Sequence, residues 1–93
     1  MFAEHAPAFE DRLPGTQTSF TTVFNMYYKR LCLYAYQFVK DESFAEDLVQ
    51  ECFVKIWTKR DRIDFTAPLT AFLYTVVRNA AYDYIRNKKI TTE

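Results

Sequence analysis

Side chains suited to nucleic-acid recognition gather in the last third of the chain. Arg78 and Arg86 are cations that can contact phosphates, and the amide of Asn79 can hydrogen-bond to a base edge. The flat ring of Tyr82 can stack on a base. At about 100° per residue these side chains share the outer part of one helix. The cluster comprises Tyr74, Thr75, Arg78, Asn79, Tyr82 and Arg86, with cations beyond its two ends at Lys59, Arg60, Arg62, Lys88 and Lys89. The alternative is that the tyrosines pack in the core and the remaining polar side chains form an ordinary solvated surface.

A second candidate surface combines carboxylates with apolar side chains. Asp47, Gln50 and Glu51 fall on one side of a helical pattern. Val54 lies in the middle of that side and Trp57 at its edge. Charge can orient a protein partner while a central apolar group adds affinity, so this mixture is typical of a helix that docks on another protein. On the pattern alone, a plain solvated face explains the acids equally well.

No pattern indicates catalysis, a metal or a cofactor. The chain has no Gly-rich phosphate loop and no nucleophile beside a plausible base, and its one histidine, His5, has no partner for such a site. Cys32 and Cys52 lack metal-ligand spacing, so we expect buried thiols rather than a disulfide or zinc site. The absence of a bilayer-length apolar run and of a secretory signal favours a soluble, cytoplasmic protein without membrane insertion.

The charges of the chain are divided unequally between its two ends. Twelve bases balance twelve acids overall, which argues against simple nonspecific attraction to nucleic acid. Up to Val54, however, four bases face eight acids, whereas from Lys55 onward eight bases face four acids. Such asymmetry indicates that the C-terminal part faces a polyanion.

Three helical patterns must position these side chains. Residues 1–18 show no sustained period and are expected to form a flexible lead-in, so the predicted domain covers residues 19–93. A helix then begins near Ser19, with apolar residues at three- and four-residue steps as far as Phe38. Three helices, each with one apolar face, predict a compact all-α bundle. The predicted apolar stripes comprise Phe20, Val23, Phe24, Tyr27, Leu31, Tyr34, Ala35 and Phe38 in the first helix, Ala45, Leu48, Val49, Cys52, Phe53 and Ile56 in the second, and Leu69, Phe72, Leu73, Val76, Val77, Ala80 and Tyr84 in the third.

A capping motif and a proline predict where the other two helices begin. Ser43 with Glu46 matches a capping box at the start of the second helix, which continues to Lys59. Residues 60–67 carry charge without a period and are expected to form a loop. Pro68 suits the first position of the third helix, where its missing N–H is not needed.

These motifs together resemble region 2 of bacterial sigma factors, particularly the small extracytoplasmic-function (ECF) group of the sigma-70 family. Residues 47–51 read DLVQE, inside FAEDLVQECFVKIW and followed by LTAFLYTVVRNAAYDYIR. The resemblance covers roughly Phe20 to Lys89. It rests on the order of the motifs, the basic loop between them and the preceding aromatic helix.

The resemblance implies two binding partners. In such factors the DLVQE helix docks on the coiled-coil clamp helices of the RNA polymerase β′ subunit. The following loop and helix open the minus-ten promoter element and hold its non-template strand, the loop forming a pocket for a flipped base. The polymerase-binding residues implied are Asp47, Gln50 and Glu51, and the helical pattern adds Val54 and Trp57 to the predicted polymerase-binding set. The residues implied to face the DNA are those of the loop from Arg60 to Ala67 and Arg78, Asn79, Tyr82 and Arg86. Together with the pattern of the chain, this predicts a DNA-binding set of Lys59, Arg60, Arg62, Phe65, Tyr74, Thr75, Arg78, Asn79, Tyr82, Arg86, Lys88 and Lys89. An anti-sigma factor is a further candidate partner.

Two departures from the family pattern bear on these expectations. Phe72 stands where the family usually has Trp. A Phe ring can still pack in the core, but it lacks the indole N–H that Trp can donate. The sequence ends at Glu93, without the helix-turn-helix domain by which such factors read the minus-thirty-five element, so that activity is not expected of this chain.

A helical protein-interaction module without a DNA role is the alternative function. Its contacts would be the apolar residues outside the core stripes, namely Met26, Leu33, Val54 and Trp57. Ordinary exposed apolar residues also explain Met26 and Leu33.

Overall fold

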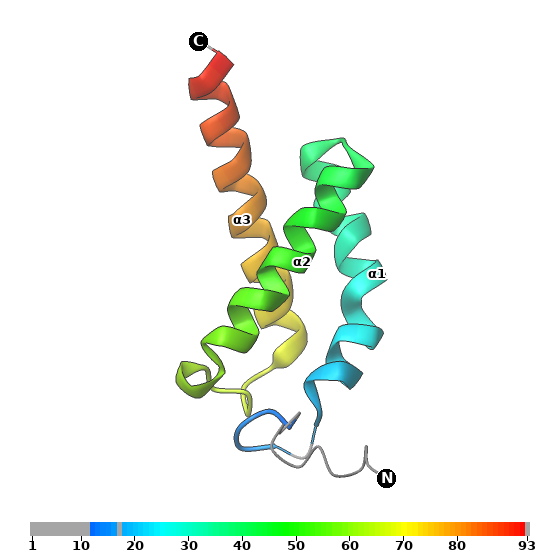
Figure 1. Cartoon of the computed structure of the whole chain (residues 1–93), viewed down its shortest axis with the longest axis vertical. Coiled ribbons are helices and arrows are strands. Elements are labelled where there is room, and N and C mark those ends of the chain that lie inside the picture. Colours follow the sequence, from blue (N-terminus) through cyan, green and yellow to red (C-terminus); the bar gives the residue numbers. More distant parts are fainter. Residues whose placement is uncertain (1–11, 17, 93) are drawn as a thin grey trace, which may run out of the picture.

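Three helices pack side by side in the computed structural model, which describes the backbone of residues 12–16 and 18–92 and the side chains as far as Asn87. They are α1 (Phe20–Val39), α2 (Glu42–Thr58) and α3 (Leu69–Thr92), with the short 3₁₀ helix η2 (Arg60–Arg62) between the last two. In Figure 1, α2 runs back along α1, and α3 then runs in the same direction as α1. The predicted all-α bundle is confirmed.

The first two helix starts are fixed by side chains that accept backbone hydrogen bonds. The hydroxyl of Ser19 accepts from the N–H of Thr22 at 3.0 Å, which confirms the predicted start of α1. At α2 the predicted capping box is wrong. Asp41 is the N-cap, and its carboxylate accepts from the N–H of Phe44 at 2.9 Å. Ser43 therefore lies inside the first turn of α2.

The third helix begins one residue later than predicted. The carbonyl of Pro68 accepts from the N–H of Phe72 at 3.3 Å, and the first helical residue is Leu69. Pro68 thus takes the N-cap position, where its fixed φ directs the chain into the helix while its carbonyl already belongs to the hydrogen-bond ladder.

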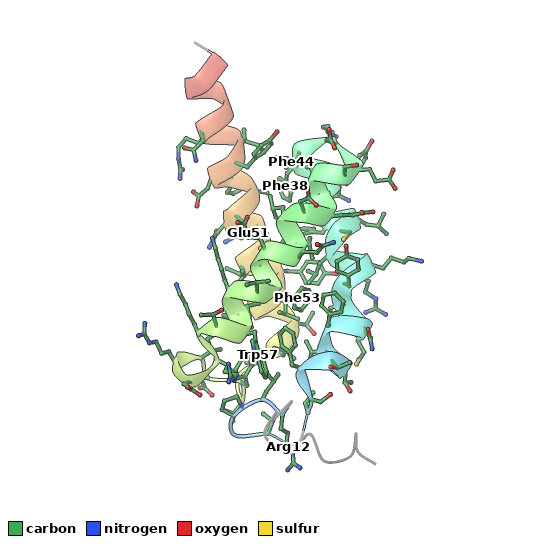
Figure 2. The ribbon with its side chains drawn as sticks, viewed as in Figure 1. Arg12, Phe38, Phe44, Glu51, Phe53 and Trp57 are labelled. Atoms are coloured by element: carbon green, nitrogen blue, oxygen red, sulfur yellow. The ribbon has the colours of Figure 1, made fainter. Side chains whose placement is uncertain are left out.

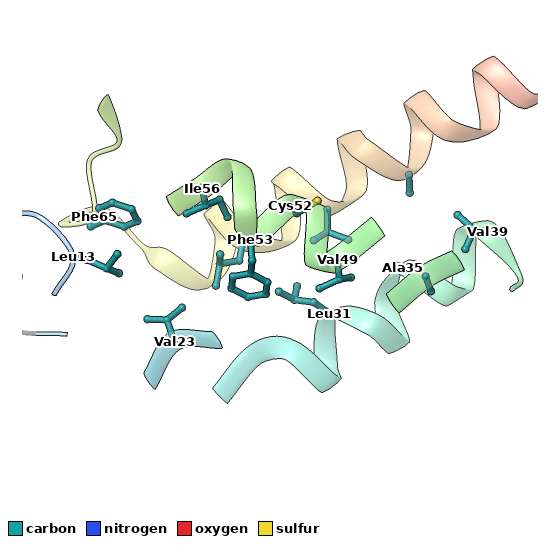
Figure 3. Packing of buried hydrophobic residues seen from close by; sticks show 14 residues of the cluster. Leu13, Val23, Leu31, Ala35, Val39, Val49, Cys52, Phe53, Ile56 and Phe65 are labelled. Atoms are coloured by element: carbon teal, nitrogen blue, oxygen red, sulfur yellow. The ribbon is translucent and has the colours of Figure 1, made fainter. Parts of the chain in front are cut away.

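The core lies where the apolar stripes of the three helices meet (Figure 3). Leu31, Val49, Leu73 and Val77 are the largest side chains that are fully buried. All four come from predicted stripes, because burial on a helix follows its 3.6-residue period. Ala81, outside the predicted stripe of α3, is fully buried as well. Its small side chain lets α3 approach its neighbours closely.

Aromatic rings fill the space between α1 and α2. Phe53 of α2 is buried, with its ring centroid 4.9 Å from that of Phe24 and 5.9 Å from that of Phe20. Both contacts are edge-to-face, the arrangement that brings a positive ring edge against a negative ring face. Figure 2 shows Phe53 between the two helices. This packing fixes which side of α2 is turned outward.

The predicted lead-in includes a turn that belongs to the core. Leu13 is only 2% exposed, and its N–H donates to the carbonyl of Thr18 at 2.9 Å. Gly15 has φ +80°, a conformation that residues with a Cβ rarely adopt, and it closes this turn beside Thr66. The packed domain therefore begins before the predicted boundary at residue 19. Residues 1–11 and 17 of the lead-in lie outside the described part of the chain.

The C-terminal part of α3 extends beyond the turn that joins α1 and α2 (Figure 1). The last ring contact of α3 with that hairpin is made by Tyr84, whose centroid lies 4.1 Å from that of Phe44. None of the described helices has the length and apolar character needed to span a bilayer.

Candidate functional site

The acidic surface of α2 is exposed and has an apolar centre. Asp47, Gln50 and Glu51 are all exposed, and Val54 between them has 62% of its surface in water. The amide of Gln50 donates a hydrogen bond to the hydroxyl of Tyr28 on α1 at 3.0 Å. Loss of this bond costs little where water can replace it, so Gln50 can turn to another partner.

Trp57 occupies the edge of this surface, but it is not an exposed apolar side chain as expected. Its ring is half-buried, with its centroid 4.8 Å from that of Phe20. The guanidinium of Arg60 covers it from outside at 3.8 Å from the ring centroid. Figure 2 shows Trp57 toward the end of the bundle where the N-terminal turn also lies. The indole therefore contributes to the fold as well as to the surface.

The segment between α2 and α3 is more ordered than the predicted loop. Its first part is η2, and Arg60 donates to the carbonyl of Trp57 at 2.7 Å. Farther on, Asp64 accepts from the N–H of Thr66 at 2.9 Å and also from its hydroxyl. These hydrogen bonds lower the pKa of Asp64, since they favour its charged form. The segment thus holds a defined shape.

Phe65 is the residue of this segment whose position departs most from expectation. Its side chain is only 7% exposed and belongs to the core cluster with Leu13. A buried ring cannot stack on a base without leaving the core. In this conformation Phe65 anchors the segment, and the exposed side chains around it include those of Arg62, Asp64 and Thr66.

The outer surface of α3 brings together most of the predicted nucleic-acid residues. Thr75, Arg78, Asn79 and Arg86 are exposed, and Tyr82 has 48% of its surface in water. Arg86 forms an ion pair with Asp83 one turn earlier. Both partners of this pair are exposed, so it contributes little to stability and leaves Arg86 able to exchange partners.

Other predicted residues lie at the margins of this surface. Tyr74 is half-buried, with its ring edge-to-face against Tyr34 of α1 at 4.8 Å between centroids. Lys59, just before η2, and Arg62, the last residue of η2, are both exposed. Lys88 and Lys89 belong to the last turns of α3, but their side chains lie outside the described ones.

The thiols lie in or against the core. Cys52 is buried, and this burial raises its pKa to about 11, because a thiolate would lose its hydration there. Cys32 is half-buried, and burial raises its pKa as well. Both are free cysteines, and the described residues include no group of acidic, histidine and cysteine side chains placed to hold a metal ion.

Two residues near the acidic surface have no role in the sequence-based site. Glu46 is exposed one turn before Gln50, and because Asp41 caps the helix, no capping function occupies its side chain. Tyr28 holds Gln50 from α1. The i, i+4 spacing of Glu46 and Gln50 could have predicted that Glu46 belongs to this surface. The contact of Tyr28 depends on how α1 packs against α2, so no local sequence pattern predicts it.

Sequence comparison relates the chain to known proteins. A family model described as sigma-70 region 2 matches residues 23–90. Two curated relatives are ECF RNA polymerase sigma factors of Bacillus subtilis (strain 168). SigW is 28% identical over 75 residues, which are 81% of this chain and 40% of SigW. SigM is 31% identical over 67 residues, which are 72% of this chain and 40% of SigM.

The chain spans about two fifths of the length of each of these relatives. No solved structure matched it. The family model nevertheless covers well over half of the 93 residues, including all of α2 and nearly all of α1 and α3. The chain therefore belongs to the sigma-70 family, as a region 2 domain of the extracytoplasmic-function type.

Proposed function

We propose that this domain serves transcription initiation by binding core RNA polymerase through α2 and the minus-ten promoter element through η2, the following segment and α3. The observation that carries the proposal is the presence of two unlike exposed surfaces on one helical bundle. One is acidic with Val54 at its centre, and the other combines cations with Tyr82. Family membership supplies the partners that suit each surface.

The acidic surface fits a basic helical partner such as the β′ coiled coil. Asp47 and Glu51 are one turn apart and exposed, so both carboxylates can meet cations of one facing helix. Val54 offers the apolar contact at the centre that exposed charge pairs by themselves do not supply. We include Glu46 in this surface, since it lies one turn before Gln50.

The surface of α3 fits single-stranded DNA. Arg78 can hold phosphates, whereas Asn79 and the exposed face of Tyr82 can contact bases. Extruding one base from the duplex costs a few kcal/mol, which stacking and a pocket can offset without ATP. The segment before α3 would provide that pocket from the accessible side chains around the anchored Phe65.

The opposite net charges of the two parts of the chain predict that the domain docks on polymerase before it binds DNA tightly. The free domain carries four excess acids up to Val54 and four excess bases after it. The acids repel a polyanion over about 8 to 10 Å at physiological salt. Docking on polymerase would cover them with cations, so DNA should bind more tightly after docking.

Polymerase capture by charge variants tests the first half of the proposal. Glu51→Lys should weaken capture by core polymerase at least ten-fold, about 1.4 kcal/mol, through like-charge contact. Asp61→Lys is the matched control, because it makes the same charge change at another exposed acid. Equal capture of both variants, with unchanged helical content, would refute the assignment of the α2 surface.

Oligonucleotide binding tests the second half. Arg78→Ala with Arg86→Ala should spare polymerase capture yet weaken binding to single-stranded minus-ten DNA. The salt dependence should also flatten, by about 0.7 in the log–log slope per lost phosphate contact. An unchanged slope would remove both residues from the DNA surface.

A protein-interaction module without a DNA role is the second candidate, and one observation favours it. Met26 and Leu33 of α1 are 59% and 65% exposed, and their seven-residue spacing places both on one side of the helix. A concentration-dependent dimer that ignores both DNA and polymerase would support this function in place of the first.

A further inference from the structure

The contact between α1 and α3 forms a second line of aromatic rings, which we call the α1–α3 seam: Tyr34, Phe38, Tyr74 and Tyr82. The ring centroids of Tyr34 and Tyr74 are 4.8 Å apart, and those of Phe38 and Tyr82 are 5.4 Å apart. Tyr34 and Phe38 also contact each other at 5.2 Å. The seam thus joins rings of α1 to two residues of the proposed DNA surface.

The rings of the seam are not fully covered. Tyr34, Phe38 and Tyr74 are half-buried, and Tyr82 is exposed. All three ring contacts are edge-to-face, with interplanar angles between 75° and 88°. A ring held by its edge or by one face keeps other parts accessible, and sequence-tolerant binding of single strands relies on such rings.

Arginines flank the seam on both helices. Arg78 is four residues from both Tyr74 and Tyr82, so it lies on their side of α3. Arg30 is four residues before Tyr34 and takes the equivalent place on α1. Both guanidinium groups are exposed, and no described carboxylate forms an ion pair with either. Two unneutralised cations beside half-exposed rings favour a polyanion with flat groups.

Because α1 and α3 are parallel, Arg30 and Arg78 lie at different positions along the seam. Because α1 and α3 run the same way (Figure 1), Arg30 lies one turn before the Tyr34–Tyr74 contact and Arg78 one turn after it. The two positions therefore differ by about eight residues of helix, about 12 Å along the axis. Gln37, seven residues after Arg30, is exposed on the same side of α1 and adds a hydrogen-bonding amide.

We propose that single-stranded promoter DNA is held in the α1–α3 seam, with Arg30 and Gln37 of α1 contacting the strand from the side opposite Arg78. This inference rests on the proposed function and extends the DNA surface to α1, where the sequence-based site has no residue. The phosphates bind the two arginines, and the exposed ring of Tyr82 stacks on a base.

Charge removal on α1 tests the proposal with a neighbouring control. Arg30→Gln should weaken binding of the 93-residue chain to labelled single-stranded minus-ten DNA about five-fold at about 50 mM salt. It should also lower the log–log salt slope by about 0.7. Lys29→Gln removes the same charge one position away, on the side of α1 that faces the start of α2, and should change neither quantity.

Adding a positive charge to α1 should raise the affinity for DNA, an effect that a folding defect cannot produce. Gln37→Lys should tighten binding and steepen the salt slope, whereas Asn25→Lys, on the side of α1 away from α3, should have a smaller effect. Thermal unfolding followed by circular dichroism would verify that all four variants fold.

The outcomes separate this proposal from the one on which it rests. Equal effects of Arg30→Gln and Lys29→Gln, or no gain from Gln37→Lys, would overturn the role of α1. If Arg78→Ala still weakened binding in that case, the DNA surface on α3 would stand. If Arg78→Ala also had no effect, the promoter-binding function itself would fail.

Discussion

The guanidinium of Arg60 lies over the indole ring of Trp57, 3.8 Å from the ring centroid. One of these residues belongs to the proposed DNA surface and the other borders the proposed polymerase surface. Arg60 also donates to the carbonyl of Trp57 at 2.7 Å. The start of the segment proposed to select a base is thus attached to the end of the helix proposed to dock on polymerase.

A double-mutant cycle on this pair should show coupling. Trp57→Leu should lower the free energy of unfolding by about 2 kcal/mol, because the ring is half-buried against Phe20. Arg60→Ala should cost less, and the coupling between the two should be about 1 kcal/mol. Urea unfolding followed by circular dichroism measures all four proteins. Strictly additive effects would show that the stacked arrangement contributes nothing.

Truncation of Leu13 should destabilise the domain although the residue lies in the predicted lead-in. Its side chain is almost fully buried beside Phe65, so Leu13→Ala should cost about 3 kcal/mol in unfolding free energy. Thr18→Ala, at an exposed side chain of the same turn, should change it by less than about 0.5 kcal/mol. If both variants unfolded at the same urea concentration, the turn would not be part of the folded unit.

Alkaline pH should weaken the fold through Cys52. Its pKa is raised to about 11 in the folded protein, so the folded state holds the thiol proton more tightly than the unfolded chain. The resulting stability is complete below the ordinary thiol pKa, about 8.5, and disappears as pH rises through the folded value. Unfolding free energies of the native protein and of Cys52→Ala should therefore converge between these two pH values. A constant difference would contradict the raised pKa.

The helices and their inward faces could be predicted from the sequence, because burial on a helix repeats with its own period. Val49 and Val77 follow from that rule. Which residue caps α2 could not be predicted, since Asp41 and Ser43 are both good N-caps by residue type. The choice bears on the proposed function, because it leaves Glu46 available for the proposed docking surface.

Aromatic residues in or beside the segment between α2 and α3 also lie deeper in the structure than the sequence predicts. Phe65 has no periodic neighbours that reveal its burial, and Trp57 falls at the edge of the outer face of α2, so the sequence assigns both to binding surfaces. The structure places Phe65 in the core and half-buries Trp57 beneath Arg60. The contacts across α1 and α3 were equally hidden, because they depend on how two helices separated by α2 come together.

The central claim is that the acidic surface of α2 docks on basic side chains of the polymerase β′ coiled coil, and a charge swap tests it most directly. The double variant Asp47→Lys with Glu51→Lys should lose capture by the native coiled coil. A coiled coil whose facing bases are changed to Glu should lose capture of the native domain. Combining the two altered partners should restore binding, because the attraction is re-formed with the signs exchanged. Failure of the combined pair to bind, while both proteins remain folded, would contradict docking through this surface.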